Sequence, residues 1–470
     1  MTFYYQNLAN QIAEKITSGE IQPNHKLSSL RSFAQHHNVS ITTAKSCYEL
    51  LESRGFIFSK PKSGYFVKNL PKLIDLPTYP EFSSHPRSIT NLELQNEIQE
   101  ASINQSRIHL GAIQLSPKLI PTETLRRSVQ RALKHSAPED FLYSDKQGHL
   151  KLRQALSNHW AEDGIYIQED SIFITHGCMP AISIVIQLLT KVGDSIIVPT
   201  PNYNGQQLLL ANLGRKIVEI PAFNTGIDLQ RLEEIMAESG AKVCLLTVNY
   251  HNPLGFCLSN ADKEKIAQLA AKYQCFIIED DIYSECGYST LKPLPIQYWD
   301  KDGYVFLCSS ISKSLSPAYR IGWLCLPSQQ EYRRSNLLSL LSLVNTPLQL
   351  GLADFINCRA YRNHLNTLRY TLLNQVEEYR SFISQNFADL EIKITQPQGG
   401  YALWIQMPKG INSLNMYRFA KEQGINIVPG EVFGEDQKYS NFIRISAGYP
   451  LNKYIRQALI ILRDWIKSQV

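Results

Sequence analysis

The spacing of apolar residues at the start of the chain predicts a helix. Between residues 4 and 18 apolar side chains recur at Leu8, Ile12 and Ile16, which is the spacing of one helical face. Glycine at position 19 can end such a helix. The chain therefore opens on an amphipathic helix that needs a partner surface.

Similar patterns predict three more elements before residue 70. These are helices at 29–36 and 41–53, separated by a turn at 37–39, and a hairpin of two short strands at 56–67. Ser40 is expected to be the N-cap of the later helix, because a serine hydroxyl can accept from an orphan amide of the first turn. Two helices joined by a tight turn are typical of a helix-turn-helix.

The segment 69–106 has a different composition. It contains four prolines among polar residues, at Pro71, Pro77, Pro80 and Pro86. Such composition is typical of a linker, although residues 89–101 have the spacing of a helix.

From Ile108 onward, short apolar runs alternate with amphipathic stretches. Strands are predicted at 171–175, 195–199, 243–248, 275–279, 305–309 and 322–326. Helices are predicted between them, at 180–189, 228–238 and 262–273. This alternation predicts an α/β fold with a mostly parallel sheet between helices. In such sheets ligands bind beyond the carboxyl ends of the strands.

Length and composition favour a multidomain globular protein. A chain of 470 residues is expected to form two or three domains, and its apolar fraction of 44% is ordinary. The first residues lack the pattern of a signal peptide, and no apolar run is long enough to cross a bilayer. The nine cysteines are scattered without a C-x-x-C pair, which predicts reduced thiols in the cytoplasm and argues against a zinc site or a disulfide framework.

The net charge of +5 is unevenly distributed. Residues 1–70 hold eight Lys or Arg and four Glu, so most of the excess lies there, and a basic end suggests a polyanionic partner. The candidate DNA contacts are Arg31, Ser40, Thr42, Thr43, Lys45, Ser46, Lys60 and Lys62. On spacing alone, a three-helix bundle with solvated lysines explains the pattern about as well.

Residues 4–68 resemble the winged helix of GntR-type bacterial transcription regulators. The resemblance rests on the order of L-A-N-Q-I-A-E-K-I-T-S-G, Y-E-L-L-E-S-R-G-F-I and K-S-G-Y-F-V. It implies binding to double-stranded DNA. Ser28 stands where the family often has proline, and Ile41 stands where it often has arginine. The second change removes a phosphate or base contact, so the operator sequence does not follow by analogy.

Lys313 lies among serines in the stretch C-S-S-I-S-K-S-L-S-P-A-Y-R. A lysine amine forms a Schiff base with an aldehyde cofactor, and pyridoxal 5′-phosphate is the commonest such partner. The phosphate needs hydroxyl and cationic donors. Ser310, Ser312 and Arg320 lie at suitable offsets around the lysine.

The phosphate also needs backbone amides at a turn or a helix N-terminus. The stretch T-H-G-C-M-P-A-I follows one predicted strand and opens a predicted helix. Gly177 permits the turn, and the amides of Cys178 and Met179 can then point at the phosphate. Pro180 suits the first helical turn, where no N–H is needed.

The ring of such a cofactor needs further contacts. Asp280 is the candidate carboxylate for the pyridine nitrogen. Tyr283 and Asn252 can bond the ring hydroxyl, and Tyr203 can stack on the ring. Each residue taken singly is more often a strand-end or packing residue. All of them follow predicted strands, however, where one ligand could contact them together.

Residues 107–465 resemble the fold-type-I aminotransferases. The resemblance is carried by Y-S-D-K-Q-G-H-L-K-L-R, H-N-P-L-G, D-D-I-Y, S-S-I-S-K-S-L-S-P-A-Y-R-I-G-W, P-Q-G-G-Y-A-L-W and F-I-R-I-S-A-G. It implies covalent attachment of the cofactor at Lys313 and the phosphate and ring contacts given above. It also implies that Arg444 binds an amino acid's α-carboxylate. It further implies that Tyr143 contacts the phosphate of the cofactor bound in a partner subunit. Met179 stands where family members commonly carry glutamine.

Together the two parts resemble the MocR group of bacterial regulators. The expected organisation is a winged helix at 1–68, a linker at 69–106, and at 107–470 an aminotransferase-like domain with a smaller C-terminal α+β subdomain. The resemblance implies a homodimer in the cytoplasm, nucleoid-associated on DNA, that senses pyridoxal 5′-phosphate or an amino compound. Two alternatives stay open: an active aminotransferase acting on an amino acid and a 2-oxo acid, and a DNA binder whose large domain only dimerises.

Overall fold

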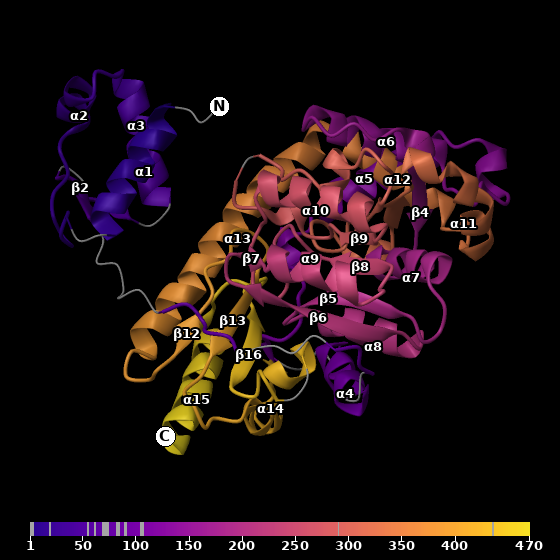
Figure 1. The fold of residues 1–470 in the computed structure, drawn as a ribbon. Helices are drawn as coiled ribbons and strands as arrows, with labels where there is room; N and C mark the ends of the chain where they lie inside the picture. The colour runs from indigo at the N-terminus through magenta and orange to yellow at the C-terminus, as the bar shows by residue number, and fades with distance from the viewer. Residues whose placement is uncertain are drawn as a thin grey trace. The chain divides into compact units, whose positions relative to one another are not determined.

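The computed structural model describes residues 4–17, 20–53, 56–60, 63–67, 75–80, 85–88, 92–103, 108–289, 291–434 and 437–470. The chain divides into two compact units, one of residues 1–74 with 380–386 and one of residues 75–379 with 387–470 (Figure 1). Lys62, a predicted DNA contact, lies outside the described residues.

The first unit contains three helices and a hairpin. They are α1 (Tyr4–Thr17), α2 (Leu30–His36), α3 (Ile41–Ser53), β1 (Ile57–Lys60) and β2 (Gly64–Val67). Side chains from all three helices and from the hairpin form one core, which includes Leu8, Phe33, Tyr48 and Val67. The predicted cap is confirmed, because the hydroxyl of Ser40 accepts from the amide of Thr43 at 3.0 Å. The apolar spacing therefore predicted these elements to within one residue.

The second unit is built on an eight-stranded sheet of order β4-β11-β10-β9-β8-β5-β6-β7. Its strands are β4 (Ile172–Thr175), β5 (Ser195–Thr200), β6 (Lys216–Phe223), β7 (Gly226–Ile227), β8 (Val243–Leu246), β9 (Phe276–Asp280), β10 (Val305–Ser310) and β11 (Gly322–Cys325). Strand β11 runs antiparallel to β10 and β4, and β7 runs antiparallel to β6. The prediction of a mostly parallel sheet is confirmed, but β6 and β7 were not predicted.

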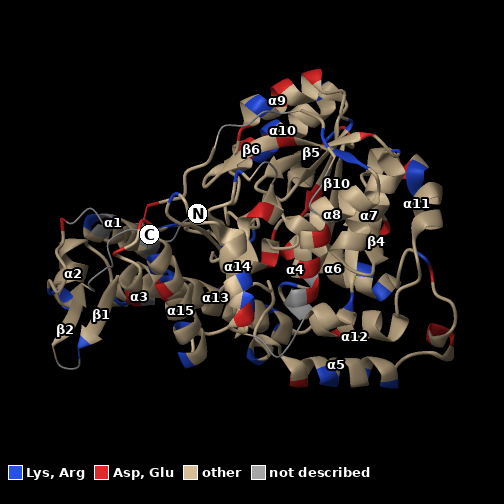
Figure 2. Cartoon of the chain, turned by 90° about the horizontal axis from the view of Figure 1, so that it is seen from below, with Lys and Arg blue, Asp and Glu red and all other residues tan. Residues whose placement is uncertain are grey.

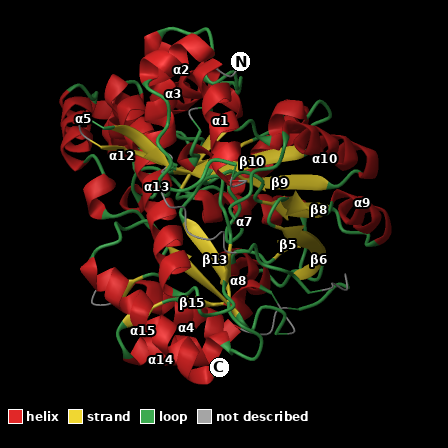
Figure 3. Cartoon of the chain, turned by 90° about the vertical axis from the view of Figure 1, so that its left-hand side faces the viewer, coloured by secondary structure: helices red, strands yellow, loops and turns green. Residues whose placement is uncertain are grey.

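Helices cover both faces of this sheet because its strands are apolar on both sides. Helices α5 (Thr122–Lys134), α6 (Leu150–Glu162) and α12 (Thr346–Ile356) share a core with Ile172 and Ile174 of β4. Helices α7 (Cys178–Leu189) and α11 (Arg334–Leu340) share another core with Phe173, which points the opposite way. Three more helices, α8 (Asn204–Asn212), α9 (Leu229–Glu238) and α10 (Asn260–Tyr273), connect successive strands (Figure 3).

A smaller lobe of the second unit has an antiparallel sheet of order β12-β13-β16-β15, as the predicted α+β subdomain requires. Its strands are β12 (Lys393–Ile394), β13 (Ala402–Gln406), β15 (Val428–Pro429) and β16 (Phe442–Ser446). The remaining elements are α4 (Leu92–Ile103), α13 (Arg359–Asn386), α14 (Ser413–Glu422), α15 (Lys453–Gln469) and the paired strands β3 (Ile108–His109) and β14 (Ile425–Asn426). Helix α4 is the helix predicted within the Pro-rich segment.

Several charged residues on the outer helices of the second unit pair with one another. Acidic and basic residues both lie along α5 (Figure 2), where Glu123 pairs with Arg126 at 2.9 Å and with Arg127 at 3.0 Å. Exposed pairs of this kind contribute little stability and keep the surface solvated. None of the described helices has the length and apolar character needed to cross a membrane. All nine cysteines carry free thiols.

Candidate functional site

The strand ends of the large sheet surround a cavity of about 190 Å³. Ten predicted cofactor residues line it: Cys178, Met179, Tyr203, Asn252, Asp280, Tyr283, Ser310, Ser312, Lys313 and Arg320. Parallel strands deliver most of these residues because their carboxyl ends lie along the same edge. Arg320 arrives at this edge because β11 is antiparallel and begins there.

Lys313 lies in the turn after β10, where its Nζ donates to the backbone oxygen of Ile113 at 2.6 Å. Burial and the nearby positive charge of Arg444 lower the pKa of Lys313 to about 8. A lysine with such a pKa has an appreciable unprotonated fraction near neutral pH, and the unprotonated amine is the nucleophile. The backbone oxygen of Lys313 accepts from the thiol of Cys286 at 3.4 Å, which fixes the turn.

Gly177 brings the N-terminus of α7 next to Arg320. Gly177 has φ +116°, and a Cβ atom there would lie 2.6 Å from Nη2 of Arg320. That same Nη2 donates to the backbone oxygen of His176 at 2.7 Å. Helix α7 has no side-chain cap, so the amides of Cys178 and Met179 are open to a ligand. A guanidinium and a helix N-terminus together suit a phosphate.

Asp280, the last residue of β9, also lines the cavity and is only 5% exposed. Its Oδ1 accepts from the thiol of Cys178 at 3.2 Å and from the amide of Ile282 at 3.3 Å. Its Oδ2 accepts from Nε2 of Gln206 at 2.7 Å. Burial raises the pKa of Asp280, while these hydrogen bonds oppose the rise. The carboxylate is thus placed to meet a ring N–H.

Three further side chains complete the ring end of the cavity. Asn252 donates through Nδ2 to the hydroxyl of Tyr283 at 3.4 Å, and its Oδ1 has no partner among the described residues. The ring of Tyr203 lies over the first turn of α8, where a Cβ on Gly205 would be 2.6 Å from its Cε1. Two hydroxyl or amide groups and an aromatic ring therefore line the same cavity as Asp280.

Arg444, on β16 of the smaller lobe, is 4% exposed. Its Nη2 donates to the backbone oxygen of Gly111, while Nε and Nη1 lack hydrogen-bond partners within the described part of the chain. Its guanidinium lies 5.4 Å from the centroid of the Phe433 ring. Burial lowers the pKa of Arg444 to about 10. A buried guanidinium with two unpaired nitrogen atoms suits a carboxylate.

These groups match the parts of pyridoxal 5′-phosphate. Its phosphate matches the α7 N-terminus with Arg320, and its pyridine nitrogen matches Asp280. Its aldehyde matches the buried amine of Lys313. The unpaired nitrogens of Arg444 would remain for an amino acid's carboxylate. The residues present therefore fit the cofactor.

Tyr143 does not belong to this cavity within one chain. It is 96% exposed and lies between a short 3₁₀ helix at 138–141 and α6. Sequence reasoning missed three residues that also line the cavity, Thr247, Ile282 and Pro317. It also missed the buried Gln206, which contacts Asp280. Gln206 lies three residues after Tyr203 at a helix start, and that offset was the only available signal.

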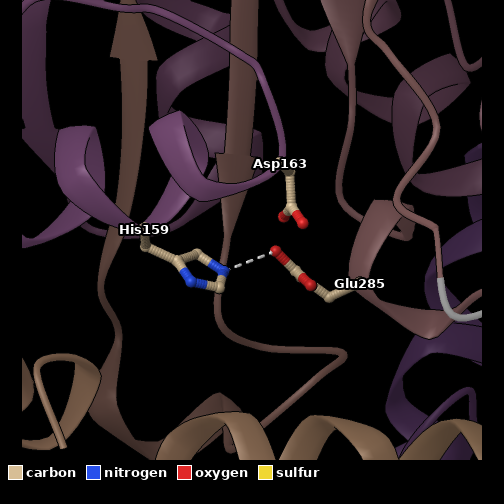
Figure 4. A group of neighbouring side chains, drawn as sticks. All are labelled: His159, Asp163 and Glu285. Atoms are coloured by element: carbon tan, nitrogen blue, oxygen red, sulfur yellow. Dashed lines mark hydrogen bonds and ion pairs between the residues drawn. The ribbon is translucent and has the colours of Figure 1, made fainter.

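Outside the cavity, His159, Asp163 and Glu285 lie close enough to hold a metal ion (Figure 4). His159 Nε2 is 3.0 Å from Oε1 of Glu285. Lys292 and Arg369 each approach the same carboxylate at 2.7 Å. Burial alone would raise the pKa of Glu285. The charges of Lys292 and Arg369 and the hydrogen bond from His159 nevertheless hold that pKa well below its usual range. Two cations so close oppose a divalent ion, so we interpret the cluster as an ion-pair network.

In the first unit, the predicted DNA contacts that the structure describes lie on α2, at the N-cap of α3, along α3 and on β1. Thr42 and Lys45 are exposed on α3, and Arg31 is exposed on α2. The hydroxyl of Thr43 is 2.9 Å from that of Ser40, so both take part in the helix cap. Lys60, at the end of β1, lies 4.7 Å above the centroid of the Phe66 ring.

Comparison with known proteins identifies relatives of both parts. Residues 111–459 match the family model "Aminotransferase class I and II", and residues 4–67 match "Bacterial regulatory proteins, gntR family". The uncharacterized HTH-type transcriptional regulator YdcR of Escherichia coli (strain K12) is 33% identical over 469 residues, which are 99% of each chain. The HTH-type transcriptional regulator NorG of Staphylococcus aureus (strain USA300) is 27% identical over 94% of this chain and 100% of its own.

Solved structures are similar to the larger part of the chain. The multiple substrate aminotransferase of Thermococcus profundus aligns with a TM-score of 0.71 and 24% identity, covering 80% of this chain and 95% of that one. LysN, an α-aminoadipate aminotransferase of Thermus thermophilus, aligns with a TM-score of 0.70 and 20% identity, covering 80% and 95%. At these identities the likeness establishes the fold alone.

Proposed function

We propose that this chain, which belongs to the aminotransferase class I and II family and carries a gntR-family domain at residues 4–67, is a DNA-binding transcription regulator that holds pyridoxal 5′-phosphate at Lys313. Relatives named as HTH-type transcriptional regulators match it over nearly the whole chain, which supports the regulatory role. The observation that carries cofactor binding is the cavity in which Lys313, Arg320 and Asp280 meet.

Each lining residue has a distinct task toward the cofactor. When bound, the cofactor supplies an electrophilic carbon and an electron-accepting ring. Arg320, the hydroxyls of Ser310 and Ser312 and the amides of Cys178 and Met179 bind the phosphate. Asp280 holds the proton on the pyridine nitrogen, and Tyr203 covers one ring face. Asn252 and Tyr283 donate to the ring oxygen.

The effector is an amino acid or a related amino compound. Arg444 binds its carboxylate through the two nitrogens that have no partner among the described residues. Once released from the cofactor, the unprotonated Nζ of Lys313 would be the base that moves a proton at the α-carbon. The effector's side chain is not specified by these contacts.

The regulator acts as a homodimer on paired half-sites. Phe141, Leu142 and Tyr143 are 61%, 70% and 96% exposed in the single chain, and such an apolar patch favours a protein interface. In the dimer Tyr143 reaches the phosphate of the partner subunit. Its DNA contacts are Arg31, Ser40, Thr42, Thr43, Lys45, Lys60 and Lys62 of each first unit. Acting on bacterial DNA locates the protein in the cytoplasm, at the nucleoid when bound.

A second candidate function is aminotransferase activity, because Lys313 and Asp280 line one cavity and the charge of Arg444 acts on the amine of Lys313. Incubation with amino donors and 2-oxo acids distinguishes the two. Rapid multiple turnover with a narrow substrate preference favours an enzyme. A half-reaction that stalls and alters DNA binding favours the sensor.

Footprinting of the DNA upstream of this gene and its neighbours, with and without pyridoxal 5′-phosphate, tests the proposal. We expect protection of two half-sites whose extent changes with the cofactor. The Lys313→Ala variant should protect the same DNA without responding to the cofactor, and should lack the visible absorbance of a lysine-bound pyridoxal. Wild-type protein that acquires no such absorbance would contradict the proposal.

A further inference from the structure

A buried glutamine contacts the carboxylate end of the cavity. Gln206, in the first turn of α8, is 1% exposed. Its Nε2 is 2.7 Å from Oδ2 of Asp280, and 3.4 Å from the hydroxyl oxygen of Thr247. Its Oε1 has no partner among the described residues. The amide is therefore oriented by its donor side, toward Asp280.

Asp280 can hold a proton on a ring nitrogen only while it keeps its own negative charge. Burial favours the neutral carboxylic acid, and the neighbouring charge of Asp281 acts in the same direction. Hydrogen bonds to the charged form act in the opposite direction. The donors available are the thiol of Cys178, the amide of Ile282 and the amide of Gln206.

Of these three donors, Gln206 makes the shortest contact. A thiol is a weak donor, and the backbone amide of Ile282 is 3.3 Å from Oδ1. Gln206 is the sole side-chain amide on Asp280 within the described residues, and it alone holds Oδ2. Each carboxylate oxygen can accept about two hydrogen bonds, so Oδ2 can still receive a ring N–H.

We propose that Gln206 is a positioning residue that keeps Asp280 ionised and oriented, and so keeps the pyridine nitrogen of bound pyridoxal 5′-phosphate protonated. This inference rests on the proposed function, because it requires the cofactor to bind. It assigns to Gln206 a role through Asp280, without contact to the reacting atoms. It also explains why a glutamine is buried three residues after the stacking candidate Tyr203.

Helix α8 provides a matched control in the next residue. Gln207 is 2% exposed, and its Nε2 donates at 3.4 Å to the backbone oxygen of Asn202. Replacing either glutamine by leucine removes the same polar atoms from the same helical turn. Only the replacement of Gln206 removes a donor from Asp280. A general packing effect would therefore change both variants, whereas the loss of a donor to Asp280 would change Gln206→Leu alone.

The experiment compares wild-type, Gln206→Leu and Gln207→Leu proteins loaded with pyridoxal 5′-phosphate that carries ¹⁵N in the ring. The ¹⁵N chemical shift reports directly whether the ring nitrogen is protonated. We expect a protonated nitrogen in wild type and Gln207→Leu, and a shift toward the unprotonated form in Gln206→Leu. Loss of one charge-assisted hydrogen bond should also weaken cofactor binding by about tenfold in Gln206→Leu.

The outcomes separate this inference from the proposed function. A fully protonated nitrogen and unchanged affinity in Gln206→Leu would overturn the role of Gln206 while leaving cofactor binding intact. Equal changes in the Gln206→Leu and Gln207→Leu variants would also overturn it. Wild-type protein that binds no cofactor would overturn both statements. If Gln206→Leu does not fold, Gln206→Asn takes its place. The asparagine side chain is one methylene shorter, so its amide does not reach Asp280. We expect the same ¹⁵N shift toward the unprotonated ring nitrogen in this variant.

Discussion

The amine of Lys313 is buried next to the positive charge of Arg444. Burial and the charge of Arg444 lower its pKa to about 8, from 10.5 for a free lysine. Only the unprotonated amine attacks an aldehyde, so cofactor attachment should accelerate with rising pH and level off above about 8. Stopped-flow absorbance at a series of pH values measures this profile.

Arg444 offers a test of the direction of this effect. Removing the neighbouring cation in Arg444→Met should raise the pKa of Lys313 and move the profile to higher pH, because a like charge no longer opposes protonation. A profile centred near 10.5 in the wild-type protein would contradict the inferred burial of this amine.

Gly177 gives a second prediction at the scale of one residue. In Gly177→Ala the new Cβ would lie 2.6 Å from Nη2 of Arg320, on a backbone with φ +116°. We expect backbone strain of about 1–3 kcal/mol and, in addition, a clear loss of cofactor affinity. Thermal unfolding and a cofactor titration measure the two effects separately.

Gly193 is the control for this change. It has φ +90°, and nothing lies within 4 Å of a Cβ added there. Gly193→Ala should therefore lose stability through the same kind of backbone strain but bind the cofactor normally. Equal losses of affinity in both variants would mean that the clash with Arg320 is unimportant.

Single residues also mark how far sequence reasoning extends. The grouping of Asp280 and Lys313 could be predicted, because both follow parallel strands and such strand ends share an edge. The two unpaired nitrogens of Arg444 could not, because they depend on how β16 packs against the segment near Gly111. Gln206 was also beyond prediction, since a buried glutamine produces no periodic signal.

At the scale of elements, described residues of the Pro-rich segment, which belong to the second unit, pack against the large sheet and the smaller lobe. The ring of Tyr79 is stacked 6.2 Å from that of Phe442 in the smaller lobe and lies edge-on 6.2 Å from Phe223 of β6. Its hydroxyl donates to Oδ1 of Asn224 at 2.7 Å. The backbone of Arg87 exchanges hydrogen bonds with Ile217 of β6 at 3.0 and 2.9 Å. These residues therefore connect the edge of the large sheet to the smaller lobe.

The contacts of this segment predict a measurable stability. Tyr79→Ala should destabilise the protein by about 2–3 kcal/mol, somewhat less than a fully buried aromatic would. Tyr79→Phe keeps the ring and loses only the hydrogen bond to Asn224, so we expect about 1 kcal/mol. Denaturant unfolding measures both. Wild-type stability in Tyr79→Ala would show that the segment is not held by its aromatic contacts.

Strand β6 was not predicted because polar and proline residues interrupt its apolar pattern. Strand β6 reads K-I-V-E-I-P-A-F, in which Glu219 and Pro221 interrupt the apolar run. Glu219 is buried but paired, at 3.5 Å from Lys438 and also with Arg87, which a one-dimensional pattern cannot indicate. The three helices of the first unit, in contrast, were predicted closely because each carries a periodic apolar face and one core buries them all.

At the scale of the whole molecule, the chain joins a gntR-family domain to an aminotransferase-family domain, so it should bind two ligands at separate places. Any equilibrium effect of one ligand on the other must then be reciprocal. If pyridoxal 5′-phosphate changes DNA affinity by some factor, operator DNA must change cofactor affinity by the same factor. Couplings of this kind are typically about 5- to 150-fold.

Four dissociation constants test this coupling: DNA with and without the cofactor, and cofactor with and without operator DNA. The first ratio compares the DNA dissociation constants without and with the cofactor, and the second compares the cofactor dissociation constants without and with operator DNA. In the wild-type protein we expect the two ratios to be equal and to differ from one. In Lys313→Ala the first ratio should be close to one, because the cofactor can no longer be held at the amine that attaches it. If the first ratio is one in the wild-type protein, cofactor binding in the larger domain does not change the DNA affinity of the first domain. The sensor role would then be wrong, and the candidate cofactor-binding groups around Lys313 would favour the enzymatic alternative.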